Sequence, residues 1–144
     1  MTTGYQRIVV AVDLFSETAP VTDALARLRS AGTECHLLHV VEPIYYVDAT
    51  FGALPMDLQN KVFEEASEKM RALGSQLDFA EVQQHILTGK ASQQVVNFAA
   101  EIDADLILLG SHGKHGLQLL LGSTASGVLH TANCDVLAVR IFTE

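Results

Sequence analysis

Five short apolar segments recur along the chain, separated by longer segments of mixed character. Four of them, residues 8–12, 35–41, 106–109 and 136–139, are largely apolar from end to end. Strands of this kind are buried on both faces, which is typical of a parallel sheet covered by helices. The fifth segment, residues 82–87, carries two glutamines near its start, so we expect it at an edge of the sheet.

The segments between these strands have the spacing of amphipathic helices. Val21, Leu25 and Leu28 are four and three residues apart, so they share one face of a helix. Further helices are expected at about residues 56–77, 89–102 and 125–132. The chain therefore alternates strand and helix in the order βαβαβαβαβ. This alternation predicts a single α/β domain over residues 1–144, with a doubly wound, five-stranded parallel sheet and helices on both faces.

The charge balance limits the partners that the domain can have. The 144 residues include 17 acidic and 9 basic side chains, which gives a net charge of -8. Such a surface repels a phosphate backbone, so nucleic acid is not an expected partner. A small anion remains possible, because backbone N–H groups close to it outweigh the distant field.

The cysteines and the apolar runs indicate a compartment. Cys35 and Cys134 are isolated, which is typical of reduced thiols in a cytoplasmic protein. The first apolar run is only five residues long, so no signal peptide is expected. No apolar run approaches the roughly 18 residues that a membrane-spanning helix needs, so no membrane association is expected either.

The most informative stretch is a glycine-rich loop between the fourth strand and the last helix. Gly110, Gly113 and Gly116 follow the apolar run, and Gly122 precedes two hydroxyl residues at the start of the helix. Glycines let backbone N–H groups approach phosphate oxygens, and a helix N-terminus adds donors and partial positive charge. The same glycines also fit a flexible surface loop. The spacing is not that of a Walker A element or of the dinucleotide fingerprint after a first strand.

The sequence resembles the universal stress protein family along its whole length. The resemblance lies in Val-Ala-Val-Asp at residues 10–13, Leu-Leu-His-Val at 37–40, and the strand and loop at 105–113. It continues at residues 120–123 and in the final strand at 134–139. These segments together are far more specific than the glycines alone.

The resemblance implies a flavodoxin-like sheet of order 3-2-1-4-5, often dimeric, with ATP or AMP bound in many members and Mg²⁺ as a possible companion. In this order the switch point lies between the first and fourth strands, where open α/β sheets bind ligands. By resemblance, Asp13 contacts the ribose or the base, Val40 contacts the base, and the glycines wrap the phosphates, with Lys114 as a compensating cation. The expected nucleotide-binding residues are Ala11, Asp13, Val40, Gly110, Gly113, Lys114, Gly122, Ser123 and Thr124.

The chain departs from the family's ATP-binding pattern in two places. That pattern has nine residues between the second glycine and the Gly-[Ser/Thr] pair, whereas eight residues separate Gly113 from Gly122 here. Either the loop tightens by one residue, or Ser123 and Thr124 take the positions of the pair and one phosphate contact is lost. Many members also have Gly-Ser after the aspartate, where this chain has Leu14 and Phe15, and Phe15 could crowd the base.

No metal site or catalytic group is expected from the sequence. His112 and His115 have a ligand-like spacing, but the loop offers no Cys, Asp or Glu to complete a site. His36 and His39 are three apart in a strand and point to opposite faces. No nucleophile with its base is recognisable, and Asp13 is the only carboxylate placed near the site. Slow ATP hydrolysis is the most that we expect of it as an enzyme.

Two functions of different classes follow. The first is a nucleotide-binding regulator of the stress response, and the second is a nucleotide-free, dimeric interaction protein with a vestigial crevice. In both, the last strand is an apolar sheet edge that a second copy would cover. The aromatic loop with Tyr45, Tyr46 and Phe51 could join that contact or cover the crevice. The expected dimer-interface residues are Val136, Leu137, Ala138, Val139 and Ile141.

Overall fold

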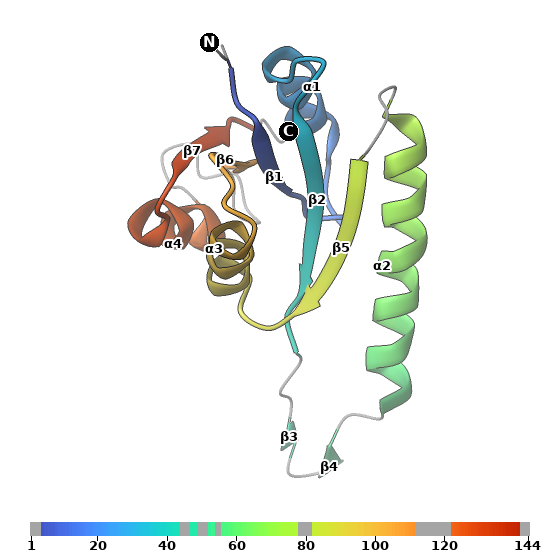
Figure 1. Ribbon diagram of the computed structural model, residues 1–144. Helices are drawn as coiled ribbons and strands as arrows, with labels where there is room; N and C mark the ends of the chain where they lie inside the picture. Colours follow the sequence, from blue (N-terminus) through green and yellow to red (C-terminus); the bar gives the residue numbers. More distant parts are fainter. Residues whose placement is uncertain are drawn as a thin grey trace.

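The coordinates are a computed structural model that describes most of the chain (Figure 1). The described residues are 4–43, 47–48, 52–53, 56–77, 82–111 and 122–141, with the backbone alone at 47, 48, 52, 53, 56 and 57. Several residues singled out from the sequence lie outside these ranges, namely Tyr45, Tyr46, Phe51, His112, Gly113, Lys114 and His115.

A five-stranded parallel sheet forms the centre of the molecule. Its strands are β1 (Arg7–Ala11), β2 (Glu34–Val41), β5 (Val82–Thr88), β6 (Leu106–Gly110) and β7 (Asp135–Val139). They lie in the order β5-β2-β1-β6-β7. Counted along the sheet's own strands, this is the order 3-2-1-4-5, which confirms the predicted fold. The glutamine-bearing strand β5 lies at one edge, as its sequence predicts, and β7 lies at the other.

Four helices in the described part of the chain cover the sheet, two on each face (Figure 1). They are α1 (Ala19–Leu28), α2 (Met56–Gln76), α3 (Ala91–Glu101) and α4 (Ser123–Thr131). Among the described residues, no helix is long and apolar enough to cross a membrane. A small antiparallel pair, β3 (Val47–Asp48) and β4 (Gly52–Ala53), was not predicted, because strands of two residues leave no periodic pattern.

Alternation along the central strands divides the core into two layers. Val10 and Leu108 pack with the layer that contains α1 and α2, whereas Val9 and Ile107 pack with α3 and α4. All four side chains are at most 1% exposed. Because both faces of these strands are packed, their sequences are continuous apolar runs. The same packing holds the carboxyl ends of β1 and β6 in place.

A polar network, which the sequence did not suggest, crosses the amino ends of the strands on the α3 side. The Arg7 side chain donates to the Glu34 carboxylate at 2.6 Å, and Glu34 contacts His36 Nε2 at 2.7 Å. His36 Nδ1 lies 3.0 Å from Nε2 of His85 on β5, and the His85 ring lies 4.5 Å from that of Phe98. No sequence motif indicated this, because only the strand register brings His36 and His85 together.

We expect this network to make the fold less stable as the pH falls below neutrality. Burial, reinforced by His36, lowers the pKa of His85. The unfolded chain therefore takes up a proton below about pH 6.5 more readily than the folded one, and stability present above that pH is lost on acidification. The hydrogen bond from His36 lowers the pKa of Glu34, which adds a loss at lower pH.

Thermal melting of the protein and of His85→Gln from pH 7.5 to 5.5 checks this expectation. The Gln side chain can still donate from the position of His85 Nε2, but it does not titrate. We expect the melting temperature of the unmodified protein to fall by about 2 to 4 °C more than that of the variant over this interval. Equal pH dependence of the two proteins would show that His85 carries none of it.

Candidate functional site

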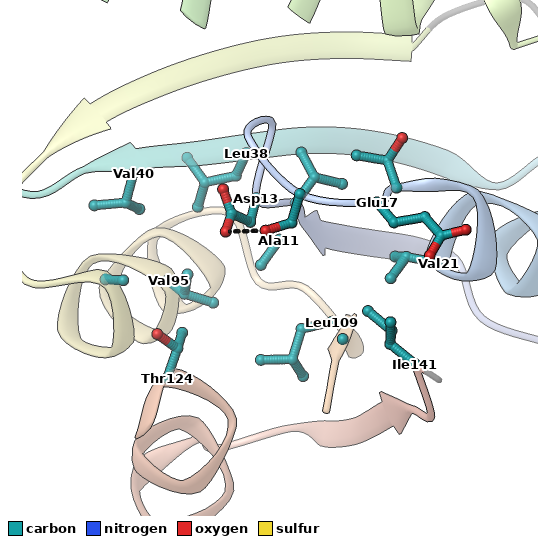
Figure 2. Close-up of a pocket in the computed structure, with 15 residues that line it drawn as sticks. Ala11, Asp13, Glu17, Val21, Leu38, Val40, Val95, Leu109, Thr124 and Ile141 are labelled. Carbon is teal, nitrogen blue, oxygen red and sulfur yellow. Dashed lines mark hydrogen bonds between the residues drawn. The ribbon is translucent and has the colours of Figure 1, made fainter. Parts of the chain in front are cut away.

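A pocket opens at the carboxyl ends of the central strands (Figure 2). Its empty space, open mouth included, is about 760 Å³. Five of the residues predicted to bind a nucleotide line it, namely Ala11, Asp13, Val40, Gly110 and Thr124.

The sheet order creates this pocket. β1 pairs with β2 on one side and with β6 on the other, so that Ala11 is opposite both Leu38 and Leu109. The chain leaves β1 toward α1 on one face of the sheet, and after β6 it reaches α4 on the opposite face (Figure 1). Connections that diverge in this way leave a crevice between the two strand ends. The pocket therefore lies at the switch point that the sequence predicts.

The walls of the pocket are mainly apolar and come from helices as well as strands. Val21 of α1 and Val95 of α3 lie on opposite sides of the crevice, and Leu38 and Leu109 also line it (Figure 2). The apolar spacing placed Val21 on the buried face of its helix, and nothing in the sequence indicated that Val21 or Val95 lines a pocket. The apolar period of each helix predicts only its buried face, and the packing of the helix decides which of these residues reach the crevice.

Backbone groups of β2 are directed into the crevice beyond the end of β1. The Val12 N–H donates to the Leu38 carbonyl at 2.9 Å, and among the described residues this is the last backbone hydrogen bond between these two segments. Backbone direction alternates along a strand, so the N–H and C=O of Val40 point the same way as those of Leu38. The N–H and C=O of Val40 therefore lie beyond the end of β1, next to the apolar wall. They offer a ligand one hydrogen-bond donor and one acceptor side by side.

A tight turn after β1 holds the Asp13 carboxylate at the mouth of the crevice. One carboxylate oxygen accepts the Phe15 N–H at 3.0 Å, and the other accepts the Ser16 hydroxyl at 2.8 Å. The Ser16 N–H donates to the Asp13 carbonyl at 3.1 Å and closes the turn. A carboxylate has about four acceptor positions, so two remain for hydroxyl groups of a ligand.

The N-terminus of α4 forms the opposite side of the site. Gly122 is its N-cap residue and has no side chain with which to cap it. The Gly122 N–H donates to Ser111 at 2.8 Å, and the Ser111 N–H donates to Val139 at the same distance, which fixes the helix start to the sheet. The first-turn N–H groups have no partner within the helix and carry partial positive charge. Thr124 lines the pocket, whereas Ser123 is exposed and is not among the lining residues.

The neighbouring helix α3 is different, because its first turn already has an anionic partner. The Ala91 N–H donates to the Glu42 carboxylate at 3.1 Å, although Ala91 also lines the pocket. Of the two helix starts on this side, α4 is therefore the better position for a ligand's negative charge. The charged residues among the described lining residues are Asp13 and Glu17, and both are acidic.

Gly110 lies where β6 reaches the pocket, and a side chain there would require the Ile141 side chain to move. A Cβ atom on Gly110 would overlap Ile141 Cδ1 and contact Val21. Ile141, which the sequence assigns to a dimer interface, thus has its side chain against Gly110 in the pocket wall. Its place in an interface remains a prediction.

Phe15 does not obstruct the pocket, contrary to the expectation from the sequence. Its ring lies 5.7 Å from the His39 ring, and Lys69 of α2 lies 5.7 Å above it. Phe15 is not among the residues that line the pocket. The side chain turns toward α2, because the Asp13 turn directs it away from the crevice.

The described residues contain no ready-made metal site. No group of three or more His, Cys, Asp or Glu side chains among them could hold a metal ion. As expected from the sequence, His36 and His39 face opposite sides of β2: His36 contacts Phe98 of α3, and His39 contacts Phe15. The two remaining phosphate-loop predictions, Gly113 and Lys114, lie outside the described residues.

Comparison with known proteins finds one family. The model of the universal stress protein family matches residues 4–140. Universal stress protein A homolog 2 of Coxiella burnetii is 39% identical over 141 residues, which are 96% of this chain and 97% of the relative. Universal stress protein MJ0577 of Methanocaldococcus jannaschii is 30% identical, with 97% and 98% covered.

Solved structures agree with this result. The structure of MJ0577 superimposes with a TM-score of 0.78 at 31% identity and covers 99% of this chain and 100% of its own. A universal stress protein of Archaeoglobus fulgidus, solved in complex with dAMP, has a TM-score of 0.58 at 23% identity, with 95% of this chain and 99% of its own covered. At that identity the likeness shows the fold alone.

Proposed function

This chain belongs to the universal stress protein family, and on that premise we propose that it binds an adenine nucleotide, ATP or AMP, in the crevice between β1 and β6. In this proposal the protein is a cytoplasmic regulator of the stress response, and the bound nucleotide determines which partners it contacts. A relative of the same fold was solved with dAMP, which makes a nucleotide a reasonable ligand to test. The residues of the crevice carry the argument.

The observation that carries the proposal is that three kinds of recognition group converge on one pocket. The apolar wall with the backbone edge of Val40 suits a planar base, which needs stacking surface and a donor–acceptor pair. The fixed carboxylate of Asp13 suits ribose hydroxyls. The start of α4 beside Thr124 suits a phosphate. A nucleotide has three parts with these requirements, and residues suited to each of them line the same pocket.

A second hollow, at the amino ends of the strands, is a poor alternative for such a ligand. It is lined by three carboxylates, those of Glu34, Asp103 and Asp105. Its cation, Arg7, already donates to Glu34 at 2.6 Å and to the Ile102 carbonyl at 2.6 Å. The carboxylates at the amino ends of the strands would repel phosphates, whereas the crevice at the carboxyl ends offers the N-terminus of α4.

The proposed role is binding rather than fast chemistry. Efficient phosphoryl transfer needs a metal-binding carboxylate and a group that orients the nucleophile. Asp13 is occupied in part by its own turn, and Glu17 is the other described carboxylate in the pocket. Any Mg²⁺ would be held mainly by the phosphates, and these two side chains could bind its water shell. Hydrolysis, where it occurs, would be slow.

Analysis of the purified protein tests the proposal. Heat denaturation followed by ion-exchange chromatography should release an adenine nucleotide. Calorimetric titration of the stripped protein with ATP and Mg²⁺, or with AMP, should give saturable heat with one site per chain. No nucleotide in the first measurement together with no heat in the second would rule out the proposal.

The alternative is a nucleotide-free dimer of the same fold with a vestigial crevice. The spacing of eight residues between Gly113 and Gly122, one fewer than the binding pattern, favours this alternative. The uncapped start of α4 and the open pocket favour nucleotide binding. The same titration separates the two functions.

We also propose a homodimer through β7, whichever function holds. β7 is a sheet edge, and the apolar Leu137 on it is 40% exposed. Leu137→Glu would place a buried, unpaired charge in the interface, so we expect at least about a 100-fold weaker dimer. Light scattering at micromolar concentration should give a dimer mass for the unmodified protein and a monomer mass for the variant. A monomeric unmodified protein would contradict the proposal.

A further inference from the structure

His39 is a buried polar residue directly beneath the Asp13 turn. The residue is 5% exposed, and its Nδ1 atom lies 3.0 Å from the Val12 carbonyl oxygen and 3.3 Å from the Leu14 nitrogen. These two backbone groups flank Asp13 in the chain. The ring therefore connects β2 to both sides of the residue that faces the ligand.

One ring nitrogen cannot serve both backbone groups at the same time. As an N–H donor, Nδ1 binds the Val12 carbonyl, and as an acceptor it binds the Leu14 N–H. Either hydrogen bond connects the Asp13 turn to β2. The Phe15 ring also packs on the His39 imidazole, with 5.7 Å between the ring centroids. The imidazole therefore holds the turn in both tautomers.

The Asp13 turn depends on such a connection because its own hydrogen bonds are local. The carboxylate contacts Phe15 and Ser16 within the turn, so these contacts fix the shape of the turn and not its position on the sheet. Among the described residues, the hydrogen bonds from the Val12–Leu14 segment to β2 are that of the Val12 N–H to the Leu38 carbonyl and those of the His39 ring. Without the His39 ring, one of these hydrogen bonds remains in the described part of the chain.

We propose that His39 is a positioning residue of the nucleotide site, which sets the distance between Asp13 and the backbone edge of Val40. His39 and Val40 are consecutive in β2, so one side chain holds the turn on one face while the next residue faces the crevice. This inference rests on the proposed nucleotide binding. It assigns a role to a histidine that does not itself touch the ligand.

Two variants and a matched control test the inference by titration with AMP. His39→Leu keeps the volume and removes the hydrogen bonds, and we expect its affinity to fall about three- to tenfold. His39→Asn places an amide near the position of Nδ1 and should recover most of that loss. His36→Leu, on the opposite face of the same strand, loses its contacts with Glu34 and His85 and should melt earlier with unchanged affinity.

A double-mutant cycle with Asp13→Asn separates positioning from a general loss of stability. If His39 acts through Asp13, the His39→Leu change should cost much less affinity in the Asp13→Asn background than in the unmodified protein. Full additivity of the two changes, or His39→Leu binding as tightly as the unmodified protein, would overturn the inference and leave nucleotide binding intact. Absence of binding by the unmodified protein would overturn both.

A measurement on the unmodified protein covers the case in which His39→Leu does not fold. Imidazole ¹⁵N chemical shifts report the tautomer of each histidine. Addition of AMP should change the Nδ1 shift of His39, because the turn above it is then held by the ligand, and should leave that of His36 unchanged. An unchanged His39 shift at saturation would contradict the inference.

Discussion

Replacing Thr124 by Glu should strongly weaken nucleotide binding and leave the fold as stable as before, or slightly more stable. Thr124 is the second residue of α4 and lines the pocket. A carboxylate in the first turn of a helix interacts favourably with the macrodipole, by about 0.3 to 1 kcal/mol. The same carboxylate would occupy the N–H groups proposed for phosphate. It would also repel the phosphate by about 4 kcal/mol at 4 Å and an effective dielectric constant near 20. We therefore expect affinity to fall by about 100- to 1,000-fold.

The control for this change is Thr124→Gln, which has the size of Glu without the charge. Its affinity should stay within about tenfold of the unmodified protein, because it preserves the backbone donors and adds no repulsion. Calorimetric titration with ATP and thermal melting of all three proteins give both quantities. Equal loss of affinity in the two variants would indicate a steric effect, and unchanged affinity in Thr124→Glu would mean that the phosphates bind elsewhere.

Replacing Leu108 by Ala should lower the free energy of unfolding by about 3 to 4 kcal/mol. Leu108 is fully buried in the central strand β6, between β1 and β7, and packs in the layer under α1 and α2. Neighbours in a parallel sheet are fixed by their backbone bonds, so the site cannot collapse and a cavity remains. A loss of this size corresponds to a decrease in melting temperature of about 10 °C.

Urea unfolding with and without nucleotide measures this loss and links it to binding. Leu108→Met, which nearly preserves volume, should cost less than about 1.5 kcal/mol. Nucleotide at 100 times its dissociation constant should restore about 2.7 kcal/mol to both variants, because it binds only the folded state. A cost below 1 kcal/mol for Leu108→Ala would contradict the packing described for β6.

The four helices and the five strands of the central sheet were predictable because each carried its own local signal, whereas the order of the strands came from the resemblance to the family. Consecutive residues of the central strands are both apolar because each contacts a different layer of the core. Val9 and Val10 are one such pair, and Ile107 and Leu108 are another. The edge position of β5 was visible for the converse reason, since an edge strand tolerates glutamines. The pair β3 and β4 was invisible, because two residues carry no period.

The candidate site was predictable only where it follows the chain locally. Asp13, Val40 and Gly110 stand at or just past strand ends, and the sheet order brings strand ends together. Val21 and Val95 belong to helix faces, and no rule of sequence separates a buried valine that lines a pocket from one that does not. Phe15 illustrates the same limit, because the hydrogen bonds of the Asp13 turn set its direction.

The most direct test of the central claim is to map nucleotide binding onto backbone amide signals by NMR. On addition of AMP, the signals of Val40, Gly110 and Thr124 should shift most, since these residues line the crevice. The signals of Arg7 and Asp105, which lie at the amino ends of the strands, should stay unchanged. Shifts confined to the amino ends of the strands, or no shifts at millimolar AMP, would contradict a nucleotide site at the carboxyl ends of β1 and β6.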